Sequence, residues 1–447
     1  MPSAKIHLIH VGNMANKGTQ ALVSSDVFVI KSIAGEDAVV SISTTDVGGV
    51  KRLGLPAGPV VDSTVDIPYE RADAYAKKMG IKRSSLRYKL FAVASLLYMF
   101  VQIALSAFSA VLIKAGLKPF YRSKSLTCIR DCDLVVSCSD ENFKESASML
   151  PSNVFWIAAW WSMLVSRVWE VLVARFLGKS VVMFPNSVGP FRTAVGRLLS
   201  RIALNYCASI IVRESISLGM VKSLGVRTNK ILTSDTTLLF DPPRKRPSQS
   251  RFAGSIGVCT GFYSHSLSER SASKYVSAHA EALDRAVEQF GVSVVFLPHY
   301  VSGFRYDDLE VSKLVLGKMR NAFKAQIVEA KTVEEFKQLI SQMEMIVSSK
   351  MHPGVLAATS YVPFVSVAYD HKQTGFSADL GMSDCVILLS EVSSGKLFGK
   401  IDYVWNKRSE LKALLESRIP ELQVHVRQSI ESVLAPFLKK SALTKGE

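Results

Sequence analysis

The chain has 447 residues, enough for two to three domains that each bury a core. Hydrophobic residues make up 48% of it and charged residues 21%, which excludes an intrinsically disordered protein. The 54 Lys and Arg outnumber the 38 Asp and Glu and give a formal charge of +16. This excess is either a solvated basic surface or a preference for anionic partners, and we expect no nucleic acid among them because no nucleic-acid-binding motif is present.

Short apolar segments alternate with helical segments from the first strand onward. The N-terminal segment Ile6–Val11 reads as a strand, since it lacks the charged region and long apolar region of a signal peptide. Runs of four to six apolar residues suit strands covered on both faces, and their alternation with helices predicts an α/β protein with parallel sheets in Rossmann-like domains. The expected strands are Ile6–Val11, Ala38–Ile42, Leu134–Ser137, Ser180–Phe184, Ser209–Val212, Ser255–Cys259, Val292–Leu297, Met345–Ser348 and Phe364–Val367.

A glycine-containing turn follows the first strand, in Gly12–Leu22. Such a turn at the start of a helix exposes unpaired backbone N–H groups and the positive end of the helix dipole, which suits a phosphate or another polar ligand. Asn16, Gly18 and Thr19 are the candidate binding residues, with Thr19 able to cap the helix. A purely structural strand–helix turn is the alternative.

The segment Leu90–Ile113 contains 24 residues without a charge, and basic residues flank it on both sides. As a helix it would be roughly 36 Å long, enough to cross a bilayer. Its four polar residues, Ser95, Gln102, Ser106 and Ser109, fall near one helical face. Three interpretations stay open: a membrane span, a helix lying in the cytoplasmic leaflet with its basic flanks on anionic lipid, and a helix buried between domains.

Two further stretches place polar residues where predicted strands end. In Phe184–Phe191, Asn186, Ser187 and Gly189 fall at the carboxyl end of a strand, where open α/β folds bind ligands. Arg213 ends the next strand and suits a carboxylate or phosphate, unless it forms a surface pair with its neighbour. Asp235 ends a later short strand, where we expect it either to orient Arg213 or to cap a turn.

The domain boundary is predicted in residues 241–250, which hold three prolines, three basic residues and no apolar residue. This gives an N-terminal domain of residues 1–245, which contains the apolar segment Leu90–Ile113, and a C-terminal domain of residues 246–447. The C-terminal domain ends in helices, with an amphipathic segment Ser409–Lys440 that Pro420 could break.

The strongest chemical signal lies in Val347–Ala358 and Val367–Leu380. His352 comes at a strand-to-helix switch, two residues after Lys350, and Pro353 is expected to leave the imidazole in the preceding loop. A histidine there can act as general acid or base near neutral pH. Lys372 belongs to a second polar cluster at a strand end, where solvated loop charge is the alternative.

No metal site and no organic cofactor are predicted, because the histidines show no ligand spacing such as HxH or HExxH. The six cysteines contain no CxxC pair, and we expect them to be reduced in a cytoplasmic protein.

Taken in order, these stretches resemble the polysaccharide pyruvyl transferase family. The family's N-x-G-T/D-x-A-L element appears at Asn16–Leu22, and its S-x-G-P-F element at Ser187–Phe191. Further matches are Val212–Ser217, Leu224–Val226 and Thr233–Leu239, then Ser348–His352, Tyr369–Lys372 and Phe376–Gly381.

The resemblance implies a fold similar to GT-B glycosyltransferases, with two Rossmann-like domains and a cleft between them. It also implies phosphoenolpyruvate as donor and a saccharide or lipid-linked saccharide as acceptor, joined as a pyruvate ketal in cell-surface polysaccharide synthesis. His352 would be the general acid, Arg213 and Lys350 would hold phosphate and carboxylate, and Lys372 would be a further anion ligand. The N-terminal domain would form the acceptor and membrane side and the C-terminal domain the donor side. The protein would work in the cytoplasm at the inner face of the membrane.

The chain departs from the family pattern in two places. Lys350 stands where the family usually has arginine, and Cys138-Ser139-Asp140-Glu141 replaces a Gly-rich loop after the Leu134–Ser137 strand. Two alternatives therefore stay open: a GT-B glycosyltransferase that uses a nucleotide sugar, and a non-catalytic membrane-associated scaffold of a polysaccharide assembly complex.

Overall fold

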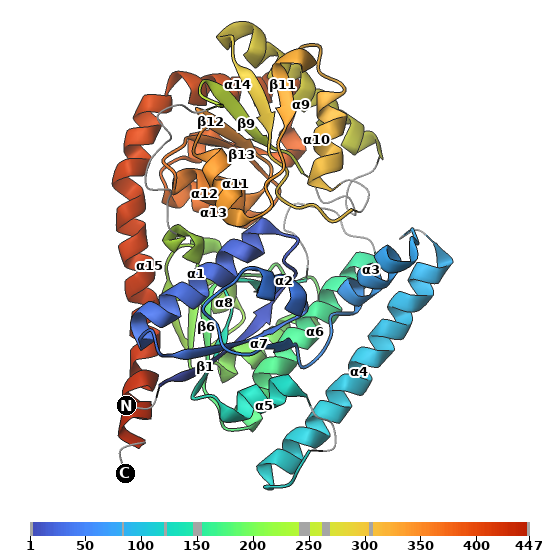
Figure 1. The fold of residues 1–447 in the computed structure, drawn as a ribbon, viewed down its shortest axis with the longest axis vertical. Coiled ribbons are helices and arrows are strands. Elements are labelled where there is room, and N and C mark those ends of the chain that lie inside the picture. Colours follow the sequence, from blue (N-terminus) through green and yellow to red (C-terminus); the bar gives the residue numbers. More distant parts are fainter. Residues whose placement is uncertain are drawn as a thin grey trace.

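The computed structural model describes residues 3–82, 85–119, 123–145, 154–240, 251–261, 269–303 and 307–444. Within these residues the chain forms two parallel β-sheets, each covered by helices, which lie one above the other in Figure 1. The predicted domain boundary between residues 245 and 246 lies outside the described residues. The α/β prediction is confirmed.

The described part of the N-terminal sheet has eight strands in the order β3-β2-β1-β4-β6-β7-β8, with β5 also paired to β6. All the pairs are parallel, as buried strands joined by helical crossovers require. The strands are β1 (Lys5–Val11), β2 (Val39–Thr44), β3 (Val60–Asp62), β4 (Leu134–Ser137), β5 (Asp140–Phe143), β6 (Val181–Val188), β7 (Ser209–Val212) and β8 (Asn229–Leu232).

The described part of the C-terminal sheet has six parallel strands in the order β11-β10-β9-β12-β13-β14. Its central strands are fully buried runs of apolar residues, which explains why their positions could be predicted from the sequence. The strands are β9 (Ser255–Cys259), β10 (Ser293–Phe296), β11 (Ala325–Ile327), β12 (Met345–Ser348), β13 (Phe364–Ala368) and β14 (Val386–Leu388).

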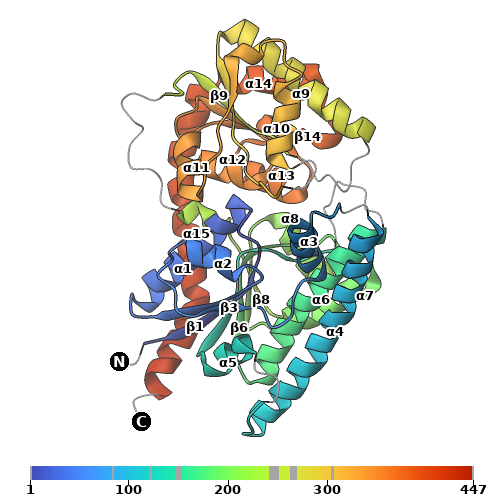
Figure 2. The ribbon, with the colours of Figure 1, turned by 45° about the vertical axis from the view of Figure 1, so that its right-hand side comes forward.

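Helices cover both faces of the sheets (Figures 1 and 2). In the N-terminal half they are α1 (Lys17–Ala34), α2 (Val47–Arg52), α3 (Pro68–Met79), α4 (Leu86–Lys114), α5 (Lys124–Asp131), α6 (Val154–Phe176), α7 (Ala194–Tyr206) and α8 (Ser215–Ser223). In the C-terminal half they are α9 (Glu269–Phe290), α10 (Asp308–Leu316), α11 (Val333–Ile340), α12 (Met351–Ala358), α13 (His371–Asp379), α14 (Ser394–Asn406) and α15 (Arg408–Thr444).

The last helix, α15, runs along both halves of the molecule (Figure 1). It is continuous through Pro420, so the break expected there is wrong. Gln423 of α15 donates a hydrogen bond from Nε2 to the carbonyl of Leu238, a residue of the N-terminal half, at 2.7 Å. This helix therefore ties the C-terminal half back onto the N-terminal sheet.

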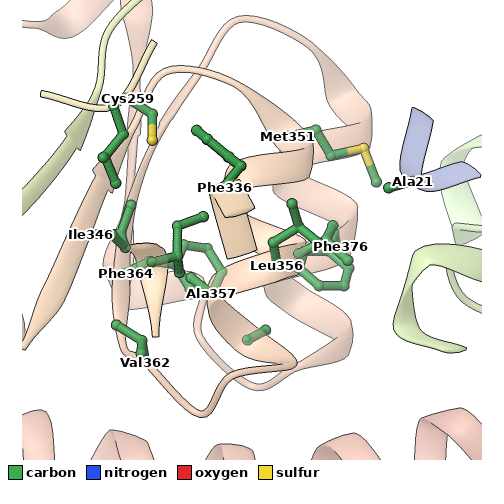
Figure 3. Packing of buried hydrophobic residues seen from close by; sticks show 14 of the residues in the cluster. Ala21, Cys259, Phe336, Ile346, Met351, Leu356, Ala357, Val362, Phe364 and Phe376 are labelled. Atoms are coloured by element: carbon green, nitrogen blue, oxygen red, sulfur yellow. The ribbon is translucent and has the colours of Figure 1, made fainter. Parts of the chain in front are cut away.

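A shared apolar core joins the two halves where α1 meets α12. Ala21 of α1 and Met351 of α12 belong to one cluster of buried residues, and their side chains lie next to each other in Figure 3. Behind Met351, α12 packs on the C-terminal core through Leu356 and Ala357. This contact fixes the start of α1 against the start of α12.

Helix α4 lies on the outer surface of the N-terminal half, packed against α3 and α6 (Figures 1 and 2). Among the described residues it is the helix long and apolar enough to cross a membrane, and 28% of its most apolar stretch is buried. The interpretation of this segment as a helix buried between domains is therefore wrong. The predicted polar face turns inward, because Ser95, Gln102, Ser106 and Ser109 are all buried.

Candidate active site

A cleft of about 1290 Å³ lies between the two halves. Because the carboxyl ends of the parallel strands of both sheets face it, the loops and helix starts that follow these strands form its walls. From the N-terminal half it is lined by residues 12–17, 19–20 and 140–142 together with parts of α3 and α6, and from the C-terminal half by residues 299–302, 307–308, 350–352, Tyr369 and Lys372.

His352 lies in the first turn of α12, not in the preceding loop as expected. Its imidazole is 7% exposed, and Nε2 has no hydrogen-bond partner. Burial lowers the pKa of His352 to about 4, against the opposing effect of the Asp235 carboxylate. Without a ligand, the imidazole is therefore neutral at neutral pH and has a nitrogen free for a substrate.

The cleft is also lined by two lysines that were predicted to bind anions, Lys350 and Lys372. Lys350 Nζ lies 3.4 Å from Oδ1 of Asp308, and Lys372 Nζ lies 2.6 Å from Oε2 of Glu141. Burial alone would raise the pKa of Glu141, but Lys144 and Lys372 hold it down to about 2. The pair between Lys372 and Glu141 also crosses from one half of the molecule to the other.

The start of α1 forms the opposite wall. Asn16 is the N-cap of α1 and accepts a hydrogen bond from the backbone N–H of Gly18 at 2.9 Å, so Thr19 is not the cap that we expected. Asn16 and Thr19 both line the cleft. Gly18 lies directly against His352, since a Cβ added at Gly18 would fall 2.2 Å from Nδ1 of that imidazole.

Arg213 lies behind this wall and does not line the cleft, which corrects the expectation that it contacts substrate directly. It is 2% exposed; its Nη1 pairs with Oδ2 of Asp235 at 2.6 Å, and its Nε donates to Oγ of Ser187 at 2.8 Å. Burial alone would lower the pKa of Arg213, but Asp235 and Glu214 raise it.

Asp235 does not end a strand, as was expected. It is the N-cap of the 3-10 helix η1 (Thr236–Leu239) and accepts a hydrogen bond from the backbone N–H of Thr237. Arg213 and Asp235 thus act on His352 through their charges.

Asn186, Ser187 and Gly189 are also not among the lining residues, and their expected substrate contacts are corrected. The first two lie inside β6, which continues to Val188. The Asn186 amide is fully buried and donates to the carbonyls of Cys138 and Phe184. Gly189 adopts φ +76°, where a Cβ would collide with Met220. These residues therefore hold the carboxyl end of the central strand β6 in place.

Among the cleft residues that were missed from the sequence, three carry groups able to act on a ligand. His299 follows β10, its ring lies 6.3 Å from that of His352 at an interplanar angle of 15°, and neither ring nitrogen has a hydrogen-bond partner. Arg167 of α6 is 4% exposed with an unpartnered Nε, and Asp140 opens β5. A histidine directly after a predicted strand was a usable signal, whereas an arginine inside an apolar helix gave none.

The GT-B-like fold is confirmed by solved structures that resemble the chain over nearly its whole length. A UDP-GlcNAc 2-epimerase from Neisseria meningitidis bound to UDP-GlcNAc has a TM-score of 0.57 at 10% identity, covering 96% of this chain and 99% of that one. Anabaena Alr3699/HepE in complex with UDP and glucose has a TM-score of 0.55 at 10% identity, covering 97% and 100%. At this identity the likeness shows the fold alone.

Sequence comparison identifies more specific relatives. A family model described as polysaccharide pyruvyl transferase matches residues 51–371. The amylovoran biosynthesis protein AmsJ of Erwinia amylovora is 22% identical over an aligned length of 260, and the match covers 54% of this chain and 61% of that protein. The match thus spans less than two thirds of the relative's length.

Proposed function

The chain belongs to the polysaccharide pyruvyl transferase family, and we propose that it transfers pyruvate from phosphoenolpyruvate to two hydroxyls of a saccharide, as a ketal, in cell-surface polysaccharide synthesis. The observation that carries this proposal is the neutral His352, whose Nε2 has no hydrogen-bond partner and which lines a large cleft together with Lys350 and Lys372. The name of the Erwinia amylovora relative, an amylovoran biosynthesis protein, supports a role in polysaccharide synthesis.

The donor carries a phosphate and a carboxylate, and the cleft offers cations for both. Lys350 and Lys372 line it. In the ligand-free protein each of them is paired with a carboxylate, and a bound anionic donor would either replace that carboxylate or bind the lysine together with it. Preorganised cations of this kind oppose the charge that develops on a leaving phosphate. Arg213 contributes from behind the wall, through its charge and by fixing Asp235.

His352 is the proposed general acid for the methylene carbon of the donor. Its pKa of about 4 leaves it neutral before the donor binds. The negative charges of a bound donor favour the imidazolium and so raise this pKa toward neutrality. His352 would thus take up a proton when the donor binds and transfer it to the methylene carbon.

The proposed acceptor is a saccharide or lipid-linked saccharide, reached from the inner face of the cell membrane. Helix α4 exposes the apolar side chains Leu90, Leu97 and Val101 while it buries its polar face. Basic residues at both ends of the helix, among them Lys89 and Lys114, suit anionic lipid headgroups. Because α3 and α6 cover the inner face, a helix lying in the leaflet fits this arrangement better than one that crosses the bilayer.

The deciding experiment incubates the purified protein with phosphoenolpyruvate and candidate free or lipid-linked glycans. We expect phosphate release together with a glycan mass that has gained a pyruvate ketal. The His352→Ala variant should lose both signals. Equal activity of this variant and the wild type would refute the mechanism, and transfer from a nucleotide sugar without phosphoenolpyruvate would refute the proposed function.

A further inference from the structure

The turn that replaces the family's Gly-rich loop is held rigidly at the edge of the cleft. Ser139 donates from its backbone N–H to Oδ2 of Asp26 at 2.7 Å and from its hydroxyl to Oδ1 of the same carboxylate at 2.8 Å. The Asn186 amide donates to the carbonyl of Cys138 and accepts from the backbone N–H of Asn142. Asp140 lies between these anchors, so its backbone position is fixed.

The carboxylate of Asp140 lines the cleft and makes no hydrogen bond or ion pair with the rest of the described chain. Its neighbour Glu141 differs in this respect, because Lys144 and Lys372 both pair with it. Burial raises the pKa of Asp140 and the Glu141 carboxylate raises it further, against the opposing charges of Arg213 and Lys372. The result is an unpaired carboxylate of increased basicity.

Asp140 and His352 both line the cleft, from opposite halves of the molecule. Lys372 lines the same cleft, and its Nζ lies 2.6 Å from Oε2 of Glu141, the residue next to Asp140. An acid and a base arranged in this way can act on the two reactants that meet between them.

One face of helix α6 continues this wall. Trp160, Met163 and Arg167 are spaced at i, i+3 and i+7, and all three line the cleft. Lys144 Nζ lies 4.6 Å from the centre of the half-buried Trp160 ring, which ties this ring to the Asp140 turn. The unpartnered Nε of Arg167 is a buried donor that a ligand oxygen would satisfy.

We propose that this wall is the acceptor subsite, in which Asp140 takes the proton of the attacking sugar hydroxyl and Trp160 supports the sugar ring. This inference rests on the proposed function. An aromatic ring offers an apolar surface to the C–H face of a pyranose, and polar groups beside it fix the orientation of the hydroxyls.

The proton balance of the reaction closes with these groups. When the first hydroxyl oxygen bonds to C2 of phosphoenolpyruvate, its proton passes to Asp140, and the methylene carbon takes a proton from His352 to become a methyl group. The second hydroxyl then bonds to the same carbon as the C–O bond to phosphate breaks, and its proton leaves with the inorganic phosphate. Afterwards Asp140 releases its proton to solvent, and His352 takes up a proton from solvent when the next donor binds.

The test uses methyl β-D-galactopyranoside and methyl β-D-glucopyranoside as probes, with the intact protein and saturating phosphoenolpyruvate. Glycoside binding is followed by saturation-transfer NMR, turnover by phosphate release and donor affinity by calorimetry. Asp140→Asn should lower kcat by about 100-fold or more with a donor Kd within about threefold of wild type, and Asp140→Glu should recover part of the rate. Trp160→Ala should raise the glycoside KM by about tenfold or more.

Trp169→Phe is the matched control. Trp169 lies on the same helix but does not line the cleft, and its Nε1 donates to Oγ of Ser106 in α4. It should behave like the wild type. The inference is overturned if Asp140→Asn keeps its kcat, if Trp160→Ala keeps its KM, or if neither glycoside binds to the donor-loaded wild type. A failure of the proposed function gives a different result: the wild type would bind no phosphoenolpyruvate but would still bind a glycoside, and Trp160→Ala would weaken that binding.

Discussion

Gly18 and His352 are in direct contact across the two halves of the molecule. A Cβ built on Gly18 would lie 2.2 Å from Nδ1 and 2.6 Å from Cγ of the imidazole, closer than non-bonded atoms can approach. The glycine at the start of α1 therefore makes room for the histidine at the start of α12. This contact links a motif of the N-terminal half to the chemistry of the C-terminal half.

The first prediction concerns this contact. Gly18→Ala should lower kcat by about tenfold or more, because the new methyl group must displace His352 or separate the two halves. A steady-state assay with phosphoenolpyruvate measures the effect. Gly219→Ala is the control: a Cβ there meets nothing within 4 Å, and its helical position in α8 predicts a stability gain of about 0.5–1 kcal/mol. Full activity of Gly18→Ala would show that the contact is dispensable.

The second prediction concerns the protonation of His352. Since its pKa is about 4 in the ligand-free protein, a negatively charged donor should raise it and draw in a proton near pH 7. Donor binding to the wild type should therefore strengthen as the pH falls from 8 to 7. Calorimetry in two buffers of different ionisation enthalpy measures the proton uptake, and His352→Asn should remove most of it. Equal uptake by both proteins would exclude His352 as the acid.

The third prediction uses a second ion pair between the halves. Nε2 of His371, in α13, lies 3.3 Å from Oε1 of Glu214, and Nδ1 of the same ring lies 2.8 Å from Oδ1 of Asp370. Burial alone would lower the pKa of His371, but these two carboxylates raise it to about 9. Because the folded pKa exceeds the unfolded value of about 6.5, the stabilisation is complete below that value and is lost as the pH rises through 9.

His371→Gln should therefore lower the free energy of unfolding by about 3 kcal/mol at pH 6.5, and the difference from wild type should shrink toward pH 9.5. Calorimetric melting at several pH values between these limits measures it. His425→Gln on the exposed face of α15 serves as the control and should match the wild type. If the difference in unfolding free energy between His371→Gln and the wild type did not change with pH, the raised pKa of His371 would be contradicted.

The fourth prediction concerns helix α4. Replacing Leu97 and Val101, which are 64% and 51% exposed, with glutamate should strongly reduce sedimentation with vesicles of phosphatidylglycerol and phosphatidylethanolamine. The cause is the loss of apolar contact together with repulsion from anionic headgroups. Phe323→Glu, at a residue 81% exposed in the C-terminal half, should not change sedimentation. Equal binding of all the proteins would rule out α4 as the membrane contact.

The sequence alone determined the parallel α/β architecture and most of its strands. The predicted strands Leu134–Ser137, Ser209–Val212, Ser255–Cys259 and Met345–Ser348 have the same bounds in the structure, because a strand buried on both faces must be apolar along its length. Strand β5 was missed because three of its four residues are polar. The order of the motifs also indicated the family, which a family model matching residues 51–371 shows.

Only the tertiary structure decided which of the predicted residues can meet a ligand. His352, Lys350 and Lys372 line the cleft, whereas Arg213 is turned away from it by Asp235, a partner 22 residues further along the chain. The place of Gly18 beside His352 depends on how two separate sheets pack. Local sequence determines backbone preference and burial, but the direction of a long charged side chain follows from partners that are distant in sequence, and these become neighbours only on folding.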